Sequence, residues 1–110
     1  MSDILDAAAI DEALAGLPGW SRKDGLLLTA FVASSAGEAL AFVAAIGAVA
    51  EEIDHHPDVD WRYDHVYIAT TSHDVGRRIT ARDVSLARRI TSLAVTAPVD
   101  VVPDAARPGA

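Results

Sequence analysis

Apolar residues recur with a helical period in the middle of the chain, and this pattern predicts a long helix. The helix is expected to begin after Ser35, because Ser35 and Glu38 match the pattern of a capping box at a helix start. It is expected to run to about Ile53, because Pro57 disfavours helical geometry at the residue before it. Apolar side chains spaced by three or four residues form its buried face: Phe42, Ile46, Val49 and Ile53.

A different period, in which apolar and polar positions alternate, predicts two pairs of strands. Asp24-Gly25 is a strong signal for a tight two-residue hairpin between the first two strands. In the second pair the alternation changes phase, which requires a turn or a bulge at Asp64-His65. The expected strands cover about residues 19–23, 26–33, 59–63 and 66–70.

Two further helices are predicted on either side of these elements. Asp6 can cap a helix over residues 7–15, and Thr80 with Asp83 can cap a helix that runs to about Leu93. The element order is then helix, strand, strand, helix, strand, strand, helix. Hairpins and helices without a strand–helix–strand repeat favour an α+β fold, with a four-stranded antiparallel sheet and helices packed on one face.

The end of the chain lacks any apolar period. Residues 97–110 contain three prolines, so we expect a single domain over residues 1–96 and a flexible tail over residues 97–110. A length of 110 residues suits one domain. A domain of this size often gains stability by association, so a homo-oligomer is expected.

Composition and charge exclude several classes of function. The formal net charge of −7 argues against direct binding of nucleic acid, which needs a basic surface. The absence of cysteine removes disulfides and thiolate chemistry. No run of 18 apolar residues is present, so no membrane span is expected. The acidic start, MSDILDAAAIDEAL, is unlike a signal peptide and favours the cytoplasm.

Three of the four histidines lie close together in the sequence, and they are the candidate chemical groups. His55 and His56 follow the long helix, and His73 follows the fourth predicted strand. Because the two strands between them form a hairpin, we expect His73 to return to the level of His55, so that the three imidazoles line one pocket. An imidazole has an unperturbed pKa near ~6.5 and can donate or accept a proton at neutral pH. Such a set suits an elimination that needs an acid and a base together.

Two other interpretations of these histidines stay open from the residues alone. A histidine pair at the C-terminal end of a helix can be structural, because its positive charge interacts favourably with the helix dipole. Three histidines with Asp54 or Glu51 can also form a zinc site. Against the metal site, adjacent side chains diverge on a regular element.

The segment EEIDHHPDVDWRY and the residues after it carry a longer pattern. It reads E-x3-H-H-P, an aromatic residue six positions after the proline, a histidine ten positions further on, and an aspartate at a helix start. This pattern resembles that of the pterin-4a-carbinolamine dehydratases, and the resemblance covers about residues 5–94, including LPGW and the Asp24-Gly25 turn. The matching residues are Glu51, His55, His56, Pro57, Tyr63, His73 and Asp83.

The resemblance implies a reaction and a role for each residue. Dehydratases of this family expel water from the 4a-hydroxytetrahydropterin that aromatic amino-acid hydroxylases release, and they form quinonoid dihydropterin. By this resemblance, His55 and His73 are the catalytic acid and base. The residues expected to orient the imidazoles or to bind the pterin are His56, Trp20, Glu51 and Asp83.

The resemblance also implies partners. No redox cofactor and no metal is required, the chain is expected to form a homodimer or homotetramer, and an aromatic amino-acid hydroxylase is a possible functional partner. Proteins similar to this family also act without catalysis, as protein-binding, assembly or transcription-coactivator modules. The histidine set favours the enzyme, since a pure scaffold has no need of it.

One loop departs from the family pattern. The family usually reads T-H-D-x-G-G-L-T, whereas this chain reads SHDVGRRIT, with Ser72 before the histidine, Arg77 in place of a glycine and one extra residue before Asp83. We therefore expect a different loop path. Arg77 or Arg78 would contact a substrate tail or lie in solvent, and the substrate can be a pterin other than biopterin.

Overall fold

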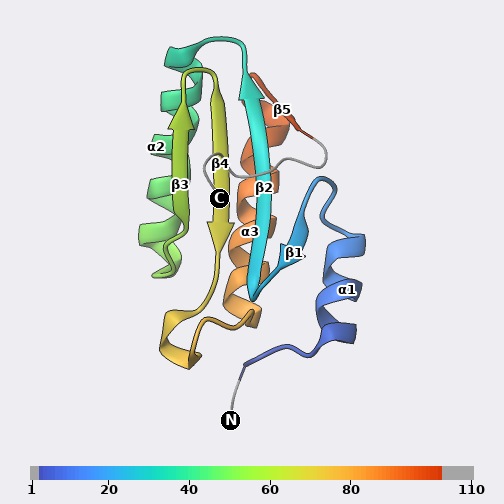
Figure 1. The fold of residues 1–110 in the computed structure, drawn as a ribbon. Helices are drawn as coiled ribbons and strands as arrows, with labels where there is room; N and C mark the ends of the chain where they lie inside the picture. Colours follow the sequence, from blue (N-terminus) through green and yellow to red (C-terminus); the bar gives the residue numbers. More distant parts are fainter. Residues whose placement is uncertain (1–2, 103–110) are drawn as a thin grey trace.

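Within residues 3–102, which the computed structural model describes, five strands form one antiparallel sheet. The strand order is β1-β2-β4-β3, and β5 pairs with the edge of β2 that also carries β1 (Figure 1). Strand β2 therefore has β4 along one edge, and β1 and β5 share the other. The strands are β1 (Ser21–Lys23), β2 (Leu26–Ala33), β3 (Asp58–Arg62), β4 (His65–Thr70) and β5 (Val99–Val101).

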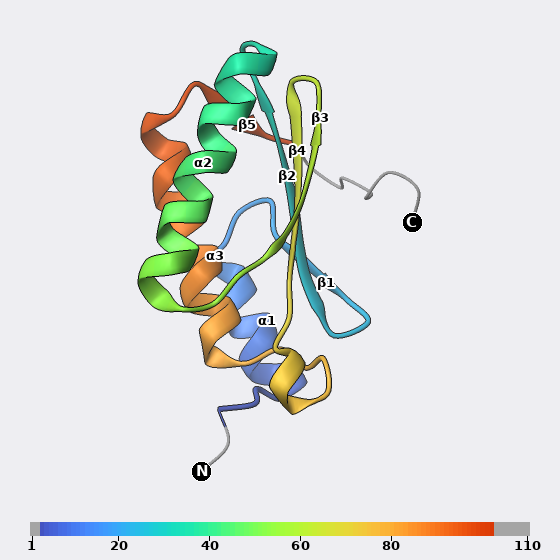
Figure 2. The same ribbon diagram turned by 90° about the vertical axis from the view of Figure 1, so that its left-hand side faces the viewer.

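The α-helices of this part of the chain lie on one face of the sheet (Figure 2). This arrangement confirms the predicted α+β fold. No helix within residues 3–102 has both the length and the apolar character needed to cross a lipid bilayer. The helices are α1 (Ala7–Ala15), α2 (Ala36–Ile53) and α3 (Ala81–Thr96), and the 3₁₀ turn η1 (His73–Val75) precedes α3.

The helix starts follow from the predicted capping residues. The Asp6 side chain caps α1, and Oγ of Ser35 accepts the backbone N–H of Glu38 at 3.1 Å. At α3 the capping box is complete, because the Asp83 carboxylate also accepts the backbone N–H of Thr80 at 2.9 Å. Each cap satisfies N–H groups that a helix start otherwise leaves without partners.

The core fills the space between the helices and the sheet. Phe31 of β2 meets Phe42 of α2 edge to face, with ring centroids 5.0 Å apart. Alternation along β2 and β4 sends one set of side chains toward the helices, as the period of two requires. The fully buried aliphatic residues include Leu17, Leu27, Ile46, Val66, Ile68, Leu86 and Ile90.

Strand β5 corrects the expectation of a flexible tail from residue 97 onward. Val99–Val101 pairs with Phe31–Ala33 of β2, and Val99 is only 8% exposed. A three-residue strand with a polar centre is too short to show a period, so its pairing depends on the β2 edge beyond the short β1. The rest of the expected tail, residues 103–110, lies outside the described residues.

Three predicted boundaries shift by a few residues. The first strand begins at Ser21, because Gly19 before it has a positive φ of 84°. The turn of the second hairpin lies at Tyr63-Asp64, with Tyr63 at a φ of 55°. Helix α3 continues to Thr96, past the expected end.

Candidate active site

The end of α2 positions His55. Asp54 adopts the left-handed conformation, with a φ of 53°, so the chain leaves the helix at this residue. The N–H of His55 still reaches the carbonyl of Ala50 at 3.1 Å. Pro57, two residues later, keeps the chain from continuing as a helix. The residue that follows this turn is buried, and His55 is 8% exposed.

The partner of His55 is Asp83, in the first turn of α3 and 28 positions away in the sequence. Its carboxylate is fully buried. Oδ1 accepts from Nε2 of His55 and from the hydroxyl of Thr70, both at 2.6 Å. Oδ2 accepts from the hydroxyl of Ser72 at 2.8 Å and from the N–H of Thr80 at 2.9 Å. A buried charge needs such partners, because burial without them is costly.

Asp83 is ionised, and it fixes the tautomer of His55. Burial raises the pKa of Asp83, but the hydrogen bonds from its four donors, with Thr70 foremost, outweigh burial and hold the pKa below its usual range. An ionised carboxylate only accepts hydrogen bonds, so Nε2 of His55 carries the proton it donates.

The other ring nitrogen of His55, Nδ1, is available for chemistry. The hydrogen bond of this side chain runs through Nε2 to Asp83. Among the described residues, no buried side-chain nitrogen or oxygen lacks a hydrogen-bond partner. Nδ1 of His55 has no hydrogen-bond partner within this part of the chain. It is therefore not one of the buried atoms, and solvent can reach it. In the neutral ring, Nδ1 then presents a lone pair that can accept a proton.

A cavity of about 300 Å³ lies beside this histidine. It is formed between the end of α2 and the first turns of α3, so both partners of the His55–Asp83 pair come from elements that border it. Such a volume is at the lower end of the range typical of small-molecule sites. Its lining residues are Ile53, His55, Ala81, Arg82 and Ser85.

Arg82 connects this cavity to the turn that carries His73. Its guanidinium donates to the carboxylates of Asp3, at 2.9 Å, and Asp74, at 3.1 Å. These bonds, with Asp3 foremost, raise the pKa of Arg82. Because Asp74 belongs to η1, Arg82 fastens that turn to α3. Sequence reasoning missed Arg82, and its place directly before Asp83 is the signal that points to it.

His56 lies on the surface and pairs with Glu51. Its Nε2 contacts Oε2 of Glu51, which is five positions earlier and near the end of α2. More than half of each side chain is exposed. The pair therefore holds an accessible imidazole at the helix end from which His55 turns inward.

His73 is exposed at the start of η1. Within residues 3–102, no side-chain hydrogen bond joins it to His55 or His56, and the cavity beside His55 is not lined by it. It is linked to His55 through its neighbour: Ser72 is buried and donates to Asp83, the carboxylate that also holds His55. The structure thus anchors two histidine-bearing segments to one carboxylate.

Trp20 belongs to the core. It is 7% exposed and is part of the main apolar cluster. Its indole N–H donates to the hydroxyl of Thr91 at 3.0 Å. A ring packed in this way supports α3 rather than offering a free face to a ligand.

The described residues 3–102 contain no group of three or more His, Cys, Asp or Glu side chains placed to hold a metal ion. The carboxylates that approach His55 and His56 do so one at a time.

The fold and the sequence place the chain in a class of known proteins. The crystal structure of a transcriptional coactivator/pterin dehydratase from Brucella melitensis aligns with a TM-score of 0.78 and 28% sequence identity, over 83% of this chain and 98% of that one. A sequence model of the family described as pterin 4 alpha carbinolamine dehydratase matches residues 3–93.

Individual relatives agree with this assignment. A protein from Thermomicrobium roseum is 42% identical over 90 residues, which cover 82% of this chain and 96% of that protein. One from Streptomyces coelicolor is 40% identical over 90 residues, which cover 82% of this chain and 89% of that protein. Both carry the provisional name pterin-4-alpha-carbinolamine dehydratase. The chain belongs to the pterin-4α-carbinolamine dehydratase family.

Proposed function

We propose that this protein eliminates water from 4a-hydroxytetrahydropterin to give quinonoid dihydropterin, and so recycles the cofactor of aromatic amino-acid hydroxylases. Membership of the family supports the reaction class. The observation that carries the proposal is the bond between Nε2 of His55 and the buried, ionised carboxylate of Asp83. A carboxylate that holds an imidazole in one tautomer leaves the other ring nitrogen to act as a general base.

The proposed chemistry moves two protons. Nδ1 of His55 accepts the proton of the ring nitrogen next to C4a, and His73 donates a proton to the departing hydroxyl, which leaves as water. After the reaction His55 carries one more proton and His73 one fewer, and proton exchange with solvent returns both imidazoles to their starting states. Asp83 positions His55, and Arg82 positions the turn that carries His73, through Asp74.

The substrate-binding roles are assigned by exposure. We propose that His56, oriented by Glu51, holds the pterin ring at the surface next to the catalytic pair. Trp20 is left with a structural role, because its ring is packed in the core. This assignment needs no metal and no redox cofactor, since the elimination uses only proton transfer.

Turnover of 4a-hydroxytetrahydropterin by purified variants tests the proposal. His55→Ala and His73→Ala are each expected to lower turnover by about 10²–10⁴-fold, the usual contribution of a general acid or base. The double variant is expected to lose less than the product of the two losses, because the groups act as a unit. His56→Ala is expected to raise KM more than it lowers kcat, and His65→Ala serves as the matched control.

The uncatalysed dehydration of a carbinolamine is appreciable, so it is subtracted in every assay. Full turnover by the His55→Ala, His73→Ala double variant would contradict the proposal and leave both histidines with structural roles.

A second candidate function is that of a protein-binding module. The similar Brucella melitensis structure is described as a transcriptional coactivator as well as a pterin dehydratase.

Helix α2 exposes a face of small and apolar side chains, with Leu40 at 47% exposure and Ala44 and Ala48 also exposed. We propose that this face, or a sheet edge, joins copies of the chain into a homodimer or homotetramer. Light scattering that shows a monomer at micromolar concentration would contradict the oligomer.

A further inference from the structure

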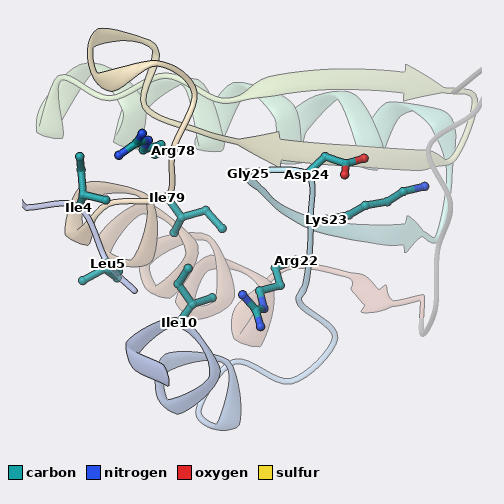
Figure 3. Close-up of a pocket in the computed structure, with 9 residues that line it drawn as sticks. All are labelled: Ile4, Leu5, Ile10, Arg22, Lys23, Asp24, Gly25, Arg78 and Ile79. Atoms are coloured by element: carbon teal, nitrogen blue, oxygen red, sulfur yellow. The ribbon is translucent and has the colours of Figure 1, made fainter. Parts of the chain in front are cut away.

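A second cavity, of about 450 Å³, lies between the N-terminal segment, the β1–β2 hairpin and the loop before α3 (Figure 3). Its apolar lining comes from segments far apart in the sequence: Figure 3 shows Ile10 and Ile79 close to each other, with Ile4 and Leu5 of the N-terminal segment to one side. Neither His55 nor Asp83 lines it, so it is distinct from the candidate active site.

The charges at this cavity are opposite to those of the chain as a whole. The sequence has 9 basic and 16 acidic residues, yet the lining includes the basic Arg22, Lys23 and Arg78 against one acid, Asp24. In Figure 3 the two arginines flank the isoleucines from different sides, whereas Lys23 and Asp24 point away from them. The cavity therefore combines an apolar floor with two guanidinium groups at its rim.

These guanidinium groups are available to a ligand. Arg78 is exposed, and its side chain makes no hydrogen bond or ion pair with the other residues in the described range. Arg22 pairs with Asp11 at 3.1 Å, but both side chains are well exposed, and such a surface pair contributes little. An anion at the cavity would gain a partner in Arg78 without first breaking an internal bond.

The walls of the cavity are fastened to one another. Gly25, at the hairpin tip, has a φ of 79°, and a Cβ there would come within 2.4 Å of the carbonyl of Arg77. The hydroxyl of Thr71 donates to the carbonyl of Gly25 at 2.8 Å. On the other side, the N–H of Leu5 donates to the carbonyl of Ile79 at 3.0 Å. A largely pre-formed pocket of this kind is typical of small-molecule sites.

We propose that this cavity binds a small molecule with an apolar body and one anionic head group of the carboxylate type. The body would pack on Ile4, Ile10 and Ile79, and the head group would bind Arg78 with support from Arg22. The proposal concerns binding alone, and it is independent of the dehydratase reaction proposed above.

Octanoate is the probe, and its binding to the full chain is followed by heteronuclear NMR. Octanoate is expected to saturate and to shift the signals of Ile4, Ile10 and Ile79. Octanol has the same chain without the charge, and acetate has the charge without the chain, so both are expected to bind at least about tenfold more weakly. Arg78→Glu is expected to weaken octanoate binding by about tenfold or more, because an attraction becomes a repulsion.

Arg62→Glu is the matched control, since it makes the same charge change on exposed β3, away from this cavity. Circular dichroism checks that both variants fold. Equal loss of octanoate affinity in both variants would overturn the proposal, as would equal binding of octanol and octanoate, or no saturable binding. Displacement of octanoate by tetrahydropterin would show one shared site and would also overturn it.

Discussion

Asp83→Asn is expected to move the proton of His55 from Nε2 to Nδ1 and so to disable the base. The replacement keeps the shape of the side chain but turns one acceptor oxygen into an amide donor. The N–H of Thr80 can only donate, so the carbonyl of the new amide must take the place of Oδ2. The amide NH₂ then occupies the position of Oδ1 and points its N–H at His55. Nε2 of a neutral imidazole can form a hydrogen bond with this donor only as an acceptor, so the ring proton must lie on Nδ1.

The magnitudes follow from the hydrogen bonds of the carboxylate. Bonds to a charged group contribute about 1.5–3 kcal/mol and neutral ones about 0.5–1.5 kcal/mol. In the neutral amide each bond falls from the first range to the second, a loss of about 1 kcal/mol, while the cost of burying a charge is removed, so the free energy of unfolding falls by about 2–4 kcal/mol. A domain of this size has about 5–15 kcal/mol in total, so the variant stays folded. Turnover is expected to fall by about 10²–10⁴-fold, because the lone pair of Nδ1 is lost.

Two measurements on the same sample test this reasoning. NMR of histidine labelled with ¹⁵N reads which ring nitrogen of His55 carries the proton, at a pH above the titration of imidazole. Background-corrected turnover of 4a-hydroxytetrahydropterin reads the activity. Asp54→Asn is the control, because Asp54 is exposed, adjacent to His55, and left-handed at a φ that asparagine also adopts.

Wild-type turnover in Asp83→Asn, with the proton of His55 still on Nε2, would refute the reasoning. An equal loss of turnover in Asp54→Asn would also refute it, because that change leaves the hydrogen bonds of the buried carboxylate in place.

Three further predictions concern stability. Deleting residues 98–110 is expected to cost about 2–3 kcal/mol and about 10–20 °C in Tm, because it removes the buried Val99 and the pairing of β5. Thermal melting of this variant beside the full chain measures the loss, and an unchanged Tm would contradict the contribution of β5. The pKa of Asp83 is lower in the folded protein than its unfolded value of about 3.9, so the ionised carboxylate stabilises the fold above that pH, and this stability is lost as the pH falls further. The difference in unfolding free energy between wild type and Asp83→Asn is therefore expected to shrink on acidification, and a difference that grows would contradict the lowered pKa. Gly19→Ala is expected to lower Tm for two reasons: its Cβ would lie 2.1 Å from Cγ2 of Val101, and alanine is strained at a φ of 84°. Adding Val101→Ala should relieve the clash but not the backbone strain, so a double variant that regains the full wild-type Tm would show that the strain contributes nothing.

Local sequence signals were sufficient to predict most of the helices and strands. The helix starts were readable, because an N-cap is decided by a side chain and an N–H two or three residues away, as at Ser35 and Glu38. The end of α2 was readable from Pro57, and the first hairpin from Asp24-Gly25. These signals, taken in chain order, were enough to predict the α+β class, and the histidine pattern was enough to indicate the family.

Which of these residues come into contact depends on how the helices and strands pack together. His55 and Asp83 are joined at 2.6 Å because α2 and α3 pack side by side, and no local rule pairs positions 28 apart. Nothing in the sequence marked Thr70 or Ser72 as a partner of Asp83, yet both hydroxyls donate to that carboxylate.

The same reason accounts for the elements that were misplaced. Val99–Val101 has no pattern of its own, and it became a strand because β2 offers an edge beyond the short β1. Trp20 was expected at the pterin site by resemblance to the family, but in the structure its ring is buried in the core and its indole N–H is bonded to Thr91 of α3. Strand pairing at a sheet edge and burial of an aromatic ring both depend on which distant segments of the chain pack beside them. The residues adjacent in sequence do not encode these contacts.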